Sequence, residues 1–171
     1  MKKIFLLAFT ILISNFSNAQ FFSKRKANKD TEKWRYEVVC MGEGKETNYT
    51  VKVFSFSKKP KVATEQAKKN AVHAIVFQGV NAGPCTSQDP LVKNPNAKDE
   101  KKEYWDAFFA NGGKYMKFVT ASNNGRVRPE DVSKISKREF KIGVIVSVDV
   151  EGLRQELEAS GILQNIGSIF K

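Results

Sequence analysis

Every second residue is apolar along one stretch in the last third of the chain. The apolar positions are Phe140, Ile142, Val144, Val146, Val148 and Val150. Side chains alternate across a β-strand, so a period of two places all of them on one face. The positions between them are mixed in polarity, which predicts a strand covered on one side only, as in an antiparallel α+β sheet. Leu153 and Leu157 follow at helical spacing, and Gly161 marks the end of the helix that they predict.

Shorter alternating runs predict the other strands. Trp34–Met41 and Tyr49–Ser57 flank a turn that contains Gly42 and Gly44, which indicates a β-hairpin. A further strand is expected over Lys114–Ser122. Residues 126–138 are expected to form a basic connector that enters the long strand.

Alanines at helical spacing predict a helix over Val62–Gln78, ended by Gly79. A second, shorter helix is expected over Glu103–Asn111. It carries four aromatic residues, namely Tyr104, Trp105, Phe108 and Phe109. These rings form either a hydrophobic plug against the sheet or an exposed contact patch for a glycan or a protein.

The pattern as a whole predicts a two-layer α+β fold. We expect an antiparallel sheet of about four strands, with helices Val62–Gln78 and Glu151–Ser160 packed on one face. Residues 34–171 are expected to form a single domain. Residues 80–102 are rich in proline, asparagine and glycine and are expected to form a long loop, a candidate for contact with a partner.

The first residues indicate export. Lys2 and Lys3 precede the apolar run Ile4–Ile13, and Ala19 supplies a small residue at the expected cleavage point, so 1–19 is a predicted signal peptide. The alternative is a retained N-terminal anchor. Residues 20–33 form a predicted basic, flexible leader, either an electrostatic tether or only a solvated terminus. No second apolar run of membrane-spanning length follows, so we expect no transmembrane helix in the mature chain.

The chain is strongly basic, with a formal net charge of +11. Such a charge favours anionic partners such as lipid A, acidic glycans or nucleic acid, and the alternative is a solvated surface that binds nothing. The candidate contacts lie in the leader and in the connector. They are Lys24, Arg25, Lys26, Lys29, Arg126, Arg128, Lys134, Lys137 and Arg138.

Cys40 and Cys85 are the two cysteines. An even count in an exported protein suggests a disulfide, and two buried free thiols are the alternative. With only one histidine, His73, the pair does not resemble a metal site. His73 has no carboxylate or cysteine motif beside it in the sequence, which favours a structural role.

The sequence holds none of the common catalytic motifs, such as GxSxG, HExxH or a phosphate-binding GKS/T loop. Asp149 lies where the long strand becomes a helix, and helix capping explains it. We therefore expect no catalytic residue, no metal and no cofactor, and a protein that is not an enzyme.

The order of elements resembles a known family. The segments KVATEQAKKNAVHAIV and FKIGVIVSVDVEGLRQELEASGI are similar to the small envelope domain of LPP20-type lipoproteins and of the N-terminus of the flagellar-assembly T protein. The family pattern falls on Val146, Val148, Leu153, Leu157 and Gly161. The segment YWDAFFANGGKYMKFV resembles a group of exported proteins of Bacteroidetes-type bacteria. The chain lacks the cysteine that carries the lipid in those lipoproteins.

The resemblance implies a non-enzymatic role in the cell envelope. We expect an exported protein, periplasmic, associated with the outer membrane or secreted, that acts as a binding or assembly accessory for an envelope protein. The alternative is a binder of an anionic ligand through its basic segments.

Overall fold

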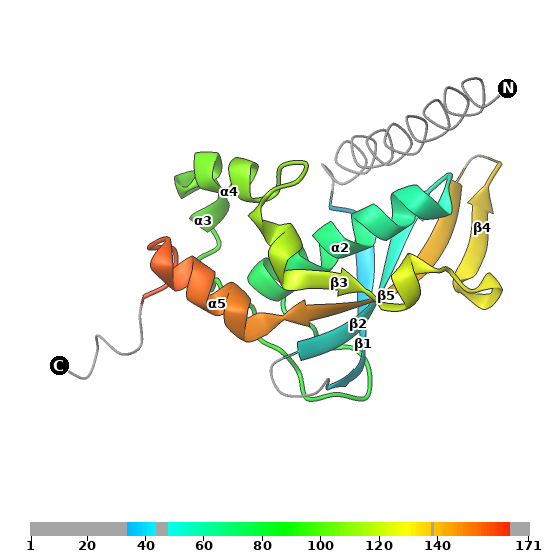
Figure 1. The fold of residues 1–171 in the computed structure, drawn as a ribbon, viewed down its shortest axis with the longest axis horizontal. Helices are drawn as coiled ribbons and strands as arrows, with labels where there is room; N and C mark the ends of the chain where they lie inside the picture. The colour runs from blue at the N-terminus through cyan, green and yellow to red at the C-terminus, as the bar shows by residue number, and fades with distance from the viewer. Residues whose placement is uncertain (1–33, 44–47, 138, 165–171) are drawn as a thin grey trace, which may run out of the picture.

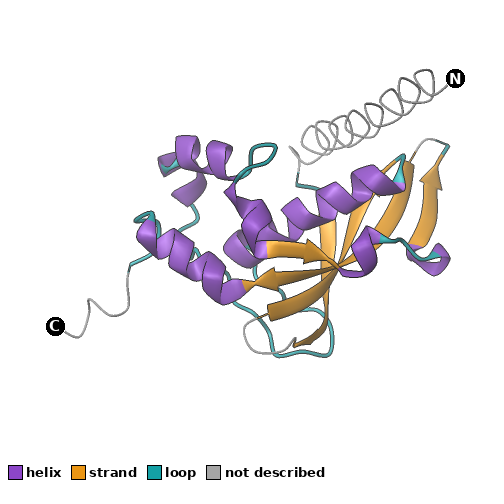
Figure 2. Cartoon of the chain, in the orientation of Figure 1, coloured by secondary structure: helices purple, strands orange, loops and turns teal. Residues whose placement is uncertain are grey.

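A computed structural model describes residues 34–43, 48–137 and 139–164. The fold is α+β, with one antiparallel sheet and helices packed against it (Figures 1 and 2). The predicted signal peptide, the basic leader, Arg138 and the end of the chain lie outside the described residues.

The sheet has five strands rather than about four. They are β1 (Tyr36–Glu43), β2 (Asn48–Ser57), β3 (Val119–Ala121), β4 (Val132–Ser136) and β5 (Glu139–Asp149). The order is β1-β2-β5-β3, and β4 also pairs with β5. The predicted hairpin is β1 and β2, and β5 lies at the centre of the sheet.

The alternation predicted for the long strand is confirmed. Ile142, Val144, Val146 and Val148 are buried, and they face the same side of the sheet as the buried Val51 and Val53 of β2. Val53 pairs with Val144 and Val51 with Val146, so the apolar faces of the two strands are in register. The register is fixed because a slip of one residue would move this set of side chains to the other face.

Helix α2 (Pro60–Phe77) lies along this apolar face (Figure 1). Ala63, Ala67, Ala71 and Ala74 are completely buried, because their small side chains let the helix approach the sheet closely. The helix begins at Pro60, where a missing backbone N–H has no cost. Gly79 has a left-handed φ of +73° and follows the end of the helix, as predicted.

The segment 80–102 is more ordered than the expected loop. Val80 and Gln88 form an isolated β-bridge, and α3 (Ala97–Glu100) lies within the segment. Helix α4 (Lys102–Phe108) follows immediately. The indole N–H of Trp105 donates a hydrogen bond to the carbonyl of Ala97 at 3.0 Å and ties the two short helices together.

The strand expected over Lys114–Ser122 is mostly wrong. Lys114–Phe118 is a 3₁₀ helix, η1, and only Val119–Ala121 is a strand. The 3₁₀ helix places the Tyr115 ring beside that of Phe109, with ring centroids 5.9 Å apart. It also places the Phe118 ring beside that of Phe108, with centroids 6.4 Å apart. An alternating pattern over so few residues does not distinguish these conformations.

The basic connector is also more structured than expected. It contains η3 (Pro129–Asp131) and β4, whose residues are all exposed, and η2 (Ser122–Gly125) comes directly before it. Because β4 buries no side chain, it has no apolar alternation that the sequence could show. Its pairing with β5 depends on backbone hydrogen bonds.

Helix α5 (Val150–Ala159) continues directly from β5. The Asp149 carboxylate accepts a hydrogen bond from the Gly152 N–H at 2.9 Å, so its role as a helix cap is confirmed. Leu153 and Leu157 are fully buried, and Gly161 ends the helix with a φ of +67°.

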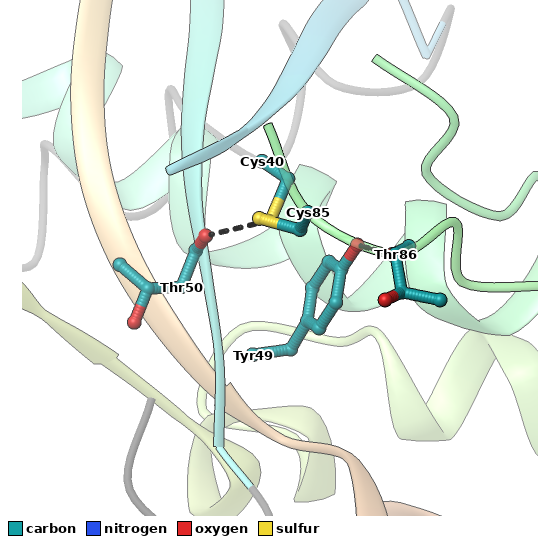
Figure 3. Close-up of a disulfide and its surroundings, with 5 residues drawn as sticks. All are labelled: Cys40, Tyr49, Thr50, Cys85 and Thr86. Atoms are coloured by element: carbon teal, nitrogen blue, oxygen red, sulfur yellow. Dashed lines mark hydrogen bonds between the residues drawn. A yellow bond between two sulfur atoms is a disulfide. The ribbon is translucent and has the colours of Figure 1, made fainter. Parts of the chain in front are cut away.

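The expected disulfide between Cys40 and Cys85 is present, with the Cα atoms 5.9 Å apart. It joins β1 to the segment that follows α2 (Figure 3). Beside it, the Tyr49 hydroxyl donates a hydrogen bond to the Thr86 carbonyl at 2.8 Å. This hydrogen bond and the disulfide hold the same segment against the hairpin.

The second face of the sheet carries phenylalanines covered by cationic side chains. The Arg35 guanidinium lies 3.9 Å from the Phe56 ring centroid, and the Lys141 ammonium lies 4.8 Å from that of Phe54. Lys52 donates to Asp131 Oδ1 at 2.8 Å. These contacts partly cover an open face.

Candidate functional site

The predicted anionic contacts that the structure describes have different surroundings. Arg128 is exposed, and its side chain already pairs with two carboxylates, Asp131 at 3.0 Å and Glu130 at 3.2 Å. Arg126 is exposed at the edge of a groove, and Lys134 and Lys137 are exposed on and after β4. Arg138 and the candidate lysines and arginine of the leader lie outside the described residues.

The predicted aromatic residues do not form an exposed contact patch. Trp105, Phe108 and Phe109 are buried, and Tyr104 is half-buried. Their rings contact one another and Phe77 of α2, so they form a hydrophobic plug, the first of the two interpretations of this helix. Trp105 and Phe109 nevertheless line a cavity.

This cavity, which we call the Trp34 cavity, has a volume of about 320 Å³. It lies between the first described residues, the C-terminal half of α2, and helices α3 and α4. Its lining residues are Trp34, Lys69, Phe77, Lys98, Asp99, Lys102, Trp105, Asp106 and Phe109.

The local sequence explains how these side chains meet. Lys69, His73 and Phe77 are four residues apart on α2, so they form one stripe along the helix. Lys98 comes from α3, and Trp34 precedes β1. The Trp34 ring stacks on the His73 ring with centroids 3.6 Å apart and an interplanar angle of 17°.

His73 lies behind the cavity wall and is only 1% exposed. Its Nδ1 atom is 2.6 Å from the Tyr36 hydroxyl, and its Nε2 atom is 2.6 Å from Lys98 Nζ. Burial, together with the positive charges of Lys98 and Lys69, lowers the pKa of His73 from 6.5 to about 2. The imidazole is therefore neutral at physiological pH.

The contacts also assign the imidazole tautomer. A lysine ammonium can only donate, so Nε2 accepts from Lys98 and Nδ1 carries the proton that it donates to the Tyr36 oxygen. Burial lowers the pKa of Lys98, and the charge of Asp99 opposes this shift. Burial raises the pKa of Tyr36.

The chemistry of this arrangement favours binding. With a pKa near 2, His73 is a poor general base at neutral pH. The aromatic walls suit a flat apolar group, and the ammonium groups at the rim suit an anion. Among the described residues, no cluster of three or more histidine, cysteine or carboxylate side chains could hold a metal ion.

The sequence interpretation of His73 as structural did not identify its partners, because Tyr36 and Lys98 are distant in sequence. One signal was available: the spacing of Lys69, His73 and Phe77 places a cation, an imidazole and an aromatic ring on one helix face. That spacing does not reveal which residues lie opposite.

A second hollow, the α2–β3 groove, has a volume of about 780 Å³. The first turns of α2 form one side, and β3 with η2 forms the other. Its lining includes three cationic side chains, Lys61, Lys68 and Arg126, and one carboxylate, that of Glu65. The Thr64 hydroxyl donates to the Gly125 carbonyl at 3.1 Å and joins the two sides.

None of the helices in the described part of the chain is both long and apolar enough to span a membrane. Comparisons with protein-family models, with curated proteins and with solved structures found no match to this chain. The resemblance to the envelope family therefore stays a prediction.

Proposed function

We propose that this chain is an exported, non-catalytic binding protein of the cell envelope. Its ligand is an anion that carries a flat apolar group, and the ligand binds in the Trp34 cavity. The observation that supports this proposal most directly is the composition of the cavity: aromatic side chains form its walls, and three lysines line it against two aspartates.

The charges around the cavity are consistent with an anionic ligand. Lys98 lies 4.5 Å from the Phe77 ring centroid and 5.5 Å from that of Trp34. None of the ion pairs between described residues involves Lys98. An incoming carboxylate would give this ammonium a charged partner, which strengthens a hydrogen bond.

Both tryptophans of the chain, Trp34 and Trp105, line the cavity, so intrinsic fluorescence reports on it directly. We expect 4-methylbenzoate to change the fluorescence in a saturable way and neutral 4-methylbenzyl alcohol to bind more weakly. Lys98→Met should weaken 4-methylbenzoate about tenfold, which is the loss of roughly one charge-assisted hydrogen bond.

Lys93→Met is the matched control, because Lys93 is exposed and does not line the cavity. It should leave the affinity unchanged. Equal affinities for the anion and the alcohol, or equal effects of the two lysine variants, would contradict an anion site in this cavity.

The second candidate function is that of an assembly accessory that binds an envelope protein. The α2–β3 groove favours it, because β3 ends the strand order and an edge strand can accept an added strand from a partner.

We expect crosslinking in the native envelope to capture a protein partner, and we expect the yield to be independent of salt concentration. Thr120→Arg, which fills the groove, should abolish capture, and Ser87→Arg on another surface should not. Equal capture by both variants would refute the groove as the docking site.

A further inference from the structure

The Trp34 cavity carries charges of both signs on the side formed by α3 and α4. Lys98 and Asp99 come from α3, and Lys102 and Asp106 come from α4. Lys102 and Asp106 form an ion pair with each other. None of the ion pairs between described residues involves Lys98 or Asp99. A ligand therefore meets one ammonium and one carboxylate whose charges are not taken up by an ion pair in the described part of the chain.

Lys98 and Asp99 are neighbours in the sequence, and both line the cavity. Burial lowers the pKa of Lys98 and the charge of Asp99 opposes this shift, so the two side chains interact. A simple aromatic carboxylate bound to Lys98 would bring its negative charge close to Asp99, and like charges repel. A ligand with a hydrogen-bond donor beside its carboxylate would instead give Asp99 a bond to accept.

The last residue of a peptide has this combination of groups. Its carboxylate and its amide N–H are attached to the same carbon atom, and Lys98 and Asp99 are adjacent on α3. An aromatic side chain on that residue would supply the flat apolar group. The matching walls are the rings of Trp34 and Phe109, with centroids 5.3 Å apart, and the ring of Phe77.

The charge balance favours a peptide carboxylate over a free amino acid. Three lysines line the cavity against two aspartates, so the lining carries one net positive charge. A residue joined through an amide carries one negative charge, whereas a free amino acid adds an ammonium that the lysines repel. Asp99, Lys102 and Asp106 are exposed, so the chain that precedes the bound residue can leave on their side. The volume of about 320 Å³ lies at the lower end of the range for ligand pockets, which suits one residue.

We propose that the Trp34 cavity binds the C-terminal aromatic residue of a partner protein. The carboxylate of that residue accepts a hydrogen bond from Lys98, its amide N–H donates to Asp99, and its ring lies between the aromatic walls. This inference rests on the proposed binding function and specifies the ligand of the same cavity.

The test compares N-acetylphenylalanine with 3-phenylpropionate, which is the same molecule without the acetamido group. Tryptophan fluorescence reports the binding of both, since both tryptophans line the cavity. N-acetylphenylalanine should bind about tenfold more tightly, which is the effect of roughly one charge-assisted hydrogen bond. Asp99→Ala should remove this preference, because the acceptor is lost.

Glu100→Ala is the matched control, because Glu100 is the next residue of α3, is also an exposed carboxylate and does not line the cavity. It should keep the preference. Equal affinities for the two compounds in the unmodified chain, or an unchanged preference in Asp99→Ala, would overturn the proposal.

Peptides test the class of partner. A short acetylated peptide that ends in phenylalanine should bind at least as tightly as N-acetylphenylalanine, and its C-terminal amide should bind about tenfold more weakly. If N-acetylphenylalanine binds and the peptide does not, a protein C-terminus is refuted as the ligand. If 3-phenylpropionate and 4-methylbenzoate bind and N-acetylphenylalanine binds no more tightly, this inference is refuted and the anion site stands. If none of these carboxylates binds, the proposed function itself is refuted.

Discussion

The burial of His73 should make the protein acid-sensitive at unusually mild pH. The pKa of His73 is lowered from 6.5 to about 2 in the folded state, whereas the unfolded chain has the ordinary value. Below pH 6.5 the unfolded state binds a proton that the native state does not bind. The stabilising effect is therefore complete above pH 6.5 and decreases as the pH falls toward 2.

The magnitude follows from the linkage between protonation and folding. Each pH unit below the unfolded pKa costs about 1.4 kcal/mol. Lowering the pH from about 7.5 to about 5 should therefore reduce the free energy of unfolding by about 2 kcal/mol. Aspartates and glutamates contribute little over this range, because their ordinary pKa values lie near 4. His73 is the single histidine of the chain, so no other histidine contributes.

The assay is urea denaturation across this pH range. His73→Gln is the matched control, because glutamine is polar and does not titrate. The variant should be less stable by about 1–3 kcal/mol at neutral pH, since it loses buried hydrogen bonds. Its stability should then be flat between about pH 7.5 and about pH 5. A flat profile for the unmodified chain, or the same slope in the variant, would refute a neutral, buried His73.

The remaining predictions concern stability and are measured by denaturant titration. Replacing Cys40 and Cys85 with serine should cost about 4 kcal/mol, the loop-entropy value for a separation of 45 residues, and an unchanged midpoint would contradict it. Asp131→Asn should cost about 2 kcal/mol, because the buried carboxylate accepts from Lys52, and a loss that high salt abolishes would show an exposed pair instead. Leu157→Ala should cost about 3 kcal/mol by leaving a cavity under α5, and a negligible loss would mean that α5 is not packed as described.

The predicted elements that proved correct are those with a long apolar period. The alternation from Ile142 to Val148 and the alanine spacing from Ala63 to Ala74 each extend over several repeats, so that only one conformation buries the apolar side chains together. The residues predicted to end or cap a helix are also confirmed. Gly79 and Gly161 follow helices, and Asp149 caps one.

The errors fall where the pattern is short or absent. Lys114–Phe118 alternates over too few residues to separate a strand from a 3₁₀ helix. Strand β4 is exposed along its whole length, and its backbone pairs with β5 without any apolar signature. The sequence left a buried plug and an exposed aromatic patch as alternatives, because burial of Trp105, Phe108 and Phe109 depends on residues that are distant in sequence.

The sequence by itself determined the α+β class, the central strand, the main helix and the two cysteines available for a disulfide. These follow from periodicity and residue chemistry, which act over neighbouring positions. Only the tertiary structure decided that His73 lies between Tyr36 and Lys98 and that the tryptophans line one cavity. Hydrogen bonds and ring stacking between distant segments depend on how the chain closes on itself, and no local pattern specifies that closure.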